Sequence, residues 1–193
     1  MTAVRVEPQL ETPRLLLRQW RPADEIAMAA INSDPEVTRY LNRPVGPAAA
    51  RAFLAMVQAH WDEHGFGFWA VQSREPEAGG AFLGFIGAGY PSFVPALSRR
   101  VEIGWRIARR GWGRGLATEG SLAARDHLLQ ALDLPELISI IHPQNSRSQR
   151  VASKLGMAVS EHVNNPVMNM QVEVWRLTPG QPAAAAGRST RPD

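Results

Sequence analysis

Three glycines alternate along the short segment Arg110–Gly115, which joins a predicted strand to a predicted helix. The residues before it, Val101–Ile107, are apolar at every second position, which predicts a strand. The residues from Ala117 to Leu132 predict a helix. Glycine has no Cβ, so Gly111, Gly113 and Gly115 allow positive φ and close approach of a ligand to the backbone. Successive N–H groups in such a turn, with the N-terminus of the next helix, form an anion-binding concavity. We therefore predict an anion site here; the alternative is a tight connection without a ligand.

Arginine is concentrated beside this turn. The chain has 20 arginines and one lysine, and six of the arginines lie between residues 99 and 114. Arg109, Arg110 and Arg114 are next to the glycines and would add full positive charges to an anion site. A net charge of +3 does not require a nucleic-acid partner, and we expect none. A nucleic-acid module with Trp105 and Trp112 as stacking platforms is the alternative.

Two common phosphate-binding motifs do not match the turn. A Rossmann dinucleotide site needs glycine at the end of G-x-G-x-x-G, where this chain has Leu116 or Thr118. A Walker A loop needs lysine after its last glycine, and the single lysine is Lys154. The chain contains no cysteine, which excludes disulfides, thiolate zinc ligands and a thiol nucleophile. What remains is the pattern R-x-x-G-x-G.

The order of helices and strands predicts a mixed sheet of the α/β (α+β mixed) class. We predict strands over 15–20, 66–73, 82–90, 101–107, 137–141, 157–163 and 168–177, the last two as a hairpin. We predict helices over 22–32, 35–41, 47–64, 117–132 and 146–154, the last with a capping box of Ser146 and Gln149. Residues 1–177 are expected to form one domain, and 178–193 a disordered tail rich in Pro, Gly and Ala. No apolar run approaches the roughly 18 residues that span a bilayer, so we expect a cytoplasmic protein without membrane contact.

Five motifs follow one another along the chain: L-E-T-P-R-L-L-L-R at Leu10–Arg18, G-F-G-F-W-A-V at Gly65–Val71, E-I-G-W at Glu102–Trp105, G-W-G-R-G-L-A-T-E at Gly111–Glu119, and N-x-x-S-x-x-V-x-x-K-L-G-M at Asn145–Met157. In this order they resemble the GNAT superfamily of acetyl-coenzyme A-dependent N-acetyltransferases. Within it they resemble the branch that acetylates the N-termini of ribosomal proteins. The resemblance implies a GNAT-like central mixed, mostly antiparallel sheet flanked by helices, in which the parallel strands 101–107 and 137–141 splay apart.

The resemblance also implies where acetyl-coenzyme A binds between those two strands. The pyrophosphate would meet N–H groups of the glycine turn, and the pantetheine arm would pair with the backbone near Ile107. No metal is expected. The implied cofactor-binding residues are Ile107, Arg109, Arg110, Gly111, Trp112, Gly113, Arg114, Gly115, Leu116, Ala117, Asn145 and Ser148.

The implied reaction is direct attack of an amine on the thioester, since the chain has no cysteine to carry the acetyl group. An amine must first lose a proton, and Glu102 is the expected general base, with His142 in reserve. Many family members protonate the leaving thiolate with a tyrosine four residues before the glycine that ends the last helix, where this chain has Ala152. Ser148 would stabilise the thiolate instead, and Asn145 would hydrogen-bond the pantetheine arm or the acceptor. The alternatives are structural roles for each of these side chains.

The acceptor is expected to be a protein or peptide N-terminal α-amine, with a small-molecule amine as the alternative. Its site is expected around Asn32–Gly46 and Pro91–Arg100. We assign Trp61, Phe66, Phe68 and Trp69 to the core, with the lining of a pocket as the alternative. A non-catalytic sensor that binds acyl-coenzyme A is a further alternative. So is a zinc peptidase, because His60–His64 matches H-x-x-E-H. We expect a monomer or a homodimer.

Overall fold

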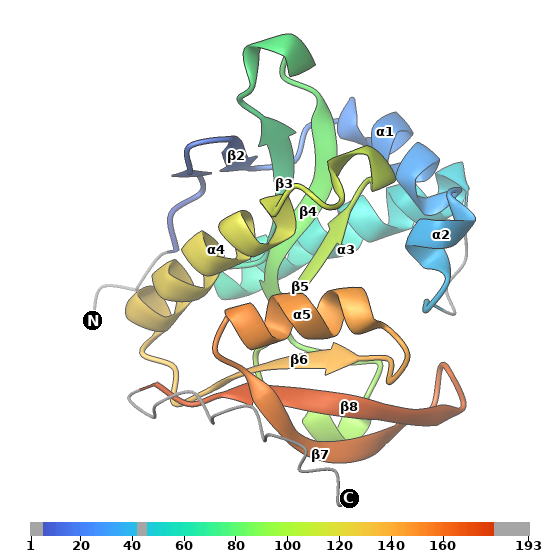
Figure 1. The fold of residues 1–193 in the computed structure, drawn as a ribbon, viewed down its shortest axis with the longest axis vertical. Helices are drawn as coiled ribbons and strands as arrows, with labels where there is room; N and C mark the ends of the chain where they lie inside the picture. The colour runs from blue at the N-terminus through green and yellow to red at the C-terminus, as the bar shows by residue number, and fades with distance from the viewer. Residues whose placement is uncertain (1–5, 42–45, 180–193) are drawn as a thin grey trace, which may run out of the picture.

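One mixed sheet organises the chain, and the computed structural model describes residues 6–41 and 46–179 (Figure 1). The eight strands lie in the order β1-β2-β3-β4-β5-β6-β8-β7. They are β1 (Leu10–Glu11), β2 (Leu15–Arg18), β3 (Phe68–Ser73), β4 (Phe82–Gly89), β5 (Glu102–Ile107), β6 (Leu137–Ile141), β7 (Ala158–Asn165) and β8 (Met170–Leu177). The helices are α1 (Asp24–Asn32), α2 (Pro35–Thr38), α3 (Pro47–His64), α4 (Leu116–Leu132) and α5 (Ser146–Lys154).

Helices cover both faces of the sheet because the side chains of β4 alternate between two apolar layers. Ile86 faces α4, which packs so closely that a Cβ on Gly120 would lie 2.5 Å from Ile86 Cδ1. Phe85 faces the other layer, where its ring centroid lies 4.9 Å from that of Phe53 on α3. Met28 of α1 belongs to that second layer. All eight positions of β4 are buried.

The predicted mixed, mostly antiparallel sheet is confirmed. Every neighbouring pair of strands is antiparallel except β5 and β6. The predicted hairpin at the end of the domain is β7–β8, in which Asn165 is paired with Met170. None of the helices among the described residues is long and apolar enough to cross a membrane.

Several predicted boundaries change in the structure. The predicted strand over 15–20 ends at Arg18, and it pairs with β1, a strand that was not predicted from the sequence. The capping box predicted for α5 is wrong: Asn145 is the N-cap, and its Oδ1 accepts the N–H of Ser148 at 3.1 Å. Gln149 instead donates to the carbonyl of Pro143 at 2.8 Å. Residues 180–193 of the predicted tail lie outside the described residues.

A buried ion pair fixes the start of α1 against β2. Arg18 and Asp24 form two parallel hydrogen bonds of 2.8 and 2.9 Å, and their side chains are 7% and 5% exposed. Asp24 also accepts the N–H of Arg21, and Gln72 accepts from Arg18 Nε, both at 2.8 Å. Removing either partner would leave the other as a buried charge that lacks its counterion and is shielded from water.

We therefore expect Asp24→Ala to lower the free energy of unfolding by about 3–5 kcal/mol, because it leaves the buried charge of Arg18 without its carboxylate. Urea denaturation measures this change. The matched control is Glu25→Ala, which removes a pair with Arg51, a side chain that is 75% exposed. That loss should be about 0–1 kcal/mol. Equal losses in the two variants would contradict the role given to burial.

Candidate active site

A cavity of about 700 Å³ lies between β5 and β6 and extends towards the early helices. Its walls come from both strands, the glycine turn, the first residues of α4, one face of α5, and parts of α2 and α3. Ten of the residues predicted for the site line it: Glu102, Ile107, Gly111, Trp112, Gly113, Gly115, Leu116, Ala117, Asn145 and Ser148. Residues far apart in sequence therefore meet around one space.

The cavity exists because β5 and β6 separate after a single paired position. Glu102 is paired with Ile138, whose N–H donates to the carbonyl of Val101 at 3.0 Å. Two residues further along β6, the N–H of Ile140 donates instead to Glu102 Oε1 at 3.3 Å. A side-chain carboxylate thus accepts an N–H that faces the gap. Glu102 is half-buried and lies at the apex of the separation.

The glycine turn presents free N–H donors to this cavity. Gly113 and Gly115 have φ of +74° and +78°, as predicted. Gly111 does not need a positive φ, so the prediction is wrong there; a Cβ on it would lie 2.8 Å from Ile107 Cγ2. Within the part of the chain that the structure describes, the N–H groups of Gly113, Arg114 and Gly115 have no acceptor. The N-terminus of α4 has no side-chain cap, which leaves the N–H groups of its first turn available as well.

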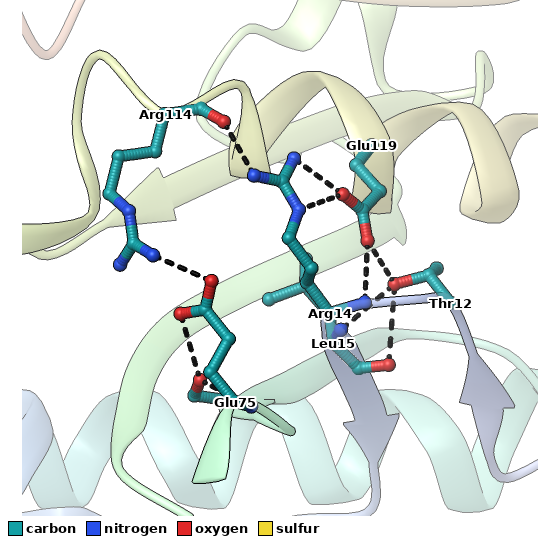
Figure 2. A network of polar contacts seen from close by, with 7 residues as sticks. Thr12, Arg14, Leu15, Glu75, Arg114 and Glu119 are labelled. Carbon is teal, nitrogen blue, oxygen red and sulfur yellow. Dashed lines mark hydrogen bonds and ion pairs between the residues drawn. The ribbon is translucent and has the colours of Figure 1, made fainter. Parts of the chain in front are cut away.

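The three arginines of the turn point away from the cavity, and none of them lines it. Arg109 pairs with Asp34 at 3.1 Å, and Arg114 pairs with Glu75 at 2.6 Å (Figure 2). Arg110 donates to the carbonyl of Phe82. Their side-chain charges are therefore engaged by protein groups, and the turn offers its backbone to the cavity.

A basic face of α5, which the sequence analysis missed, faces the cavity instead. Arg147, Arg150 and Lys154 line it together with Val151. Arg147 lies over the Trp112 ring, 4.5 Å from its centroid. The sequence does indicate this face, because residues 147, 150, 151 and 154 have the spacing i, i+3, i+4 and i+7, which places them on one side of a helix.

Asn145 and Ser148 come together at the start of α5. The Asn145 side chain caps the helix through its oxygen, while its amide nitrogen and the Ser148 hydroxyl bond to no other described residue. Both side chains line the cavity. Ala152 is fully buried, so that position lies in the core. His142 Nδ1 accepts the N–H of Gln144 at 3.0 Å, and the His142 ring lies 4.9 Å from that of Tyr40.

The far end of the cavity is aromatic. Of the four residues assigned to the core, Trp69 and Phe66 are buried there and Trp61 packs against it. Phe68 packs against the second apolar layer and also lines the cavity. The two predicted acceptor segments contribute lining residues: Glu36, Val37, Tyr40, Leu41, Ser92 and Phe93. Residues 42–45 of the first segment lie outside the described residues.

The H-x-x-E-H motif has structural partners. His60 Nε2 accepts the N–H of Tyr90 at 3.3 Å, so Nδ1 carries the proton that bonds to the carbonyl of Phe66 at 2.7 Å. Both ring nitrogens are therefore occupied by the backbone. No group of three or more metal-ligating side chains occurs in residues 6–41 and 46–179.

Burial lowers the pKa of His60 below its ordinary value of 6.5; the Phe66 hydrogen bond and Glu63 oppose the shift, and His64 adds to it. The unfolded chain therefore protonates first as the pH falls, so the stability held by neutral His60 is complete above pH 6.5 and is lost below it.

We expect His60→Gln to flatten the loss of stability measured between about pH 8 and pH 5. Exposed His162 on β7 supplies the control variant, His162→Gln, which should keep the wild-type slope. An unchanged slope in His60→Gln would assign the pH dependence to other groups.

Comparisons with known proteins agree with this geometry. A family model for an acetyltransferase (GNAT) domain matches residues 14–158. A Bacillus subtilis (strain 168) protein named uncharacterized N-acetyltransferase YoaA is 30% identical over 152 residues, which cover 77% of this chain and 82% of the relative. An acetyltransferase from Agrobacterium tumefaciens str. C58 has a similar crystal structure, with a TM-score of 0.75, 27% identity, and coverage of 89% of this chain and 94% of that one. Mycobacterium smegmatis RimJ, solved in complex with CoA-disulfide, shares the fold at 19% identity, with a TM-score of 0.65 and coverage of 88% and 85%.

Proposed function

Because the chain belongs to the GNAT family of acetyltransferases, we propose that it transfers the acetyl group of acetyl-coenzyme A directly to a protein or peptide N-terminal α-amine. The supporting observation is the set of free N–H donors at Gly113, Arg114 and Gly115, beside a helix N-terminus without a side-chain cap. Such a concavity suits the pyrophosphate of coenzyme A.

The residues present fit the rest of the cofactor. Arg147, Arg150 and Lys154 of α5 also line the cavity and supply positive charges for the phosphate groups, although Arg147 lies 3.9 Å from the carboxylate of Glu36. Beyond Glu102, β5 pairs with no residue of β6, so its backbone on that side can hydrogen-bond the amides of the pantetheine arm. The carbonyl of Ile107 already accepts the indole N–H of Trp112 at 2.7 Å, so a bond from the arm would share or replace that one. The three arginine side chains of the turn bind Asp34, Glu75 and the Phe82 carbonyl and so hold the turn in place. They can contact the phosphates only by giving up these protein partners.

Acetyl-coenzyme A would supply the acetyl group as a thioester. Glu102 is proposed to take the proton from the amine, directly or through a water molecule. The amine nitrogen then forms the new bond to the acetyl carbon as the carbon–sulfur bond breaks. Ser148 and the amide nitrogen of Asn145 can donate hydrogen bonds to the departing sulfur or to the pantetheine arm.

The acceptor end of the cavity is lined by residues of the early helices and of the segment after β4. It is bordered by Tyr40, Phe68, Tyr90 and Phe93, and Glu102 supplies an acidic group that favours an approaching ammonium. Glu36 also lines the cavity, but its carboxylate lies within 4.0 Å of Arg39 and 3.9 Å of Arg147. A panel of N-terminal peptides, polyamines, aminoglycosides and amino acids, assayed by thiol release, tests the acceptor class. Turnover on peptides alone supports the proposal. Turnover on small amines only would show that the acceptor is a small molecule and not a peptide. Binding of acetyl-coenzyme A without turnover on any amine would indicate a sensor.

Gly113→Glu tests the cofactor site. Wild-type protein should gain thermal stability with acetyl-coenzyme A. The variant should lose that shift, because a carboxylate at the turn blocks and repels the pyrophosphate. Gly65→Glu is the matched control, since Gly65 has φ +73° against +74° for Gly113 and both would place a Cβ in open space. A normal shift in Gly113→Glu would rule out this placement of the cofactor.

Glu102→Gln tests the general base. Glutamine keeps an oxygen that can accept the Ile140 N–H, so the separation of the strands should survive. We expect kcat to fall by roughly 100-fold or more, as for loss of a general base, with unchanged acetyl-coenzyme A binding. Raising the pH should recover part of the rate, because more of the amine is then already deprotonated. A wild-type kcat would leave Glu102 with a structural role only.

A further inference from the structure

A polar network behind the glycine turn connects it to the β1–β2 hairpin (Figure 2). Arg14 lies at its centre. The guanidinium donates from Nη1 to the carbonyl of Arg114 at 2.9 Å and from Nε to Glu119 Oε2 at 2.7 Å. Its Nη2 also approaches Glu119 Oε2 at 2.6 Å.

The other oxygen of Glu119 is held by the same hairpin. Oε1 accepts from the Thr12 hydroxyl at 2.6 Å and from the N–H of Arg14 at 3.0 Å. Thr12 Oγ1 in turn accepts the N–H of Leu15 at 2.9 Å. Two sequence motifs separated by about a hundred residues therefore form one connected network.

We propose that Arg14 is a positioning residue that orients the glycine turn for anion binding, with Glu119 and Thr12 as its anchors. This inference rests on the proposed function for the identity of the anion. Arg14 itself does not line the cavity. It acts through the Arg114–Gly115 peptide.

Peptide geometry gives the first reason. The C=O of Arg114 and the N–H of Gly115 belong to one planar trans peptide and point in opposite directions. Holding that carbonyl on the Arg14 side therefore aims the N–H of Gly115 away from Arg14. Gly115 lines the cavity, so this N–H is among the donors that an anion would meet.

Charge gives the second reason. Glu119 lies in the first turn of α4, where a carboxylate complements the helix dipole but would oppose an anionic ligand at the same N-terminus. Arg14 compensates that charge behind the turn. Burial would raise the pKa of Glu119, but the bonds from Thr12 and Arg14 outweigh it and lower the pKa, so the carboxylate is ionised at neutral pH.

Arg14→Met tests the proposal, and Arg74→Met is its matched control. Arg74 supports the same hairpin, because it holds the carbonyl of the anchor residue Thr12 at 2.6 Å and the carboxylate of Glu11 at 3.1 Å, but it does not touch the turn. The two variants therefore separate loss of hairpin support from loss of the contact to Arg114. The two side chains are 37% and 42% exposed. Arg14→Met should raise the Kd and KM for acetyl-coenzyme A roughly tenfold, the change that about 1.4 kcal/mol produces.

The donor substrate separates positioning from general damage. S-acetylpantetheine has the thioester but no phosphates, so its kcat/KM should differ from wild type by no more than about twofold in Arg14→Met. Amide hydrogen exchange of residues 109–119 in the ligand-free protein is the second readout. It should be faster in Arg14→Met and unchanged in Arg74→Met.

Equal losses of kcat/KM with acetyl-coenzyme A and with S-acetylpantetheine would overturn the proposal. So would an unchanged Kd for acetyl-coenzyme A together with unchanged amide hydrogen exchange of residues 109–119. If Arg14→Met does not fold, the same measurements are made on Arg14→Lys. Lysine keeps the charge near Glu119 but cannot hold the Arg114 carbonyl and both contacts to Glu119 at once, so it should show a smaller rise in Kd. If wild-type protein does not bind acetyl-coenzyme A, the proposed function fails, while the exchange rates still decide whether Arg14 orders the turn.

Discussion

The separation of β5 and β6 is the constraint on which the site depends. A parallel pair inside a sheet would normally continue its ladder of hydrogen bonds, and unpaired N–H groups would be costly if they were buried. Here the ladder stops after Glu102 and Ile138, and Glu102 accepts the next N–H, that of Ile140. At the apex of the gap, the Glu102 side chain therefore satisfies a backbone N–H that would otherwise lack an acceptor. On its other side β5 stays paired with β4, so only the β5 backbone groups turned towards β6 face the cavity, where a ligand or water can satisfy those that have no protein partner.

The glycine turn shows how a highly charged sequence can present a site made mainly of backbone. Asp34, Glu75 and the Phe82 carbonyl bind the three arginines that flank the glycines. These contacts fasten the turn to α2 and to the β3–β4 hairpin without filling the cavity. The N–H groups then remain free, and α5 supplies cationic side chains to the same cavity. The local concentration of arginine alone would have predicted a site lined by these arginine side chains and not by backbone N–H groups.

The sequence was sufficient to predict the mixed sheet, the hairpin at its end and the position of the glycine turn, because these depend on local periodicity and glycine spacing. It was not sufficient to predict the partners of Arg109 and Arg114, since Asp34 and Glu75 lie far away in the sequence and meet them only in the folded chain. The cap of α5 was assigned to Ser146 for a related reason. The competing residue, Asn145, satisfies the same kind of N–H, and only geometry decides between them.

Asn145 also shows why a structural role and a role at the site need not exclude each other. Its oxygen caps α5 by accepting the Ser148 N–H, which fixes the side chain and leaves the amide nitrogen for the cavity. The same bond fixes the first turn of α5 and therefore the position of the Ser148 hydroxyl. Arg150 and Val151 follow on the same short helix. A single cap thus orients polar donors and one end of the basic face together, so the precision of this wall comes from helix formation itself.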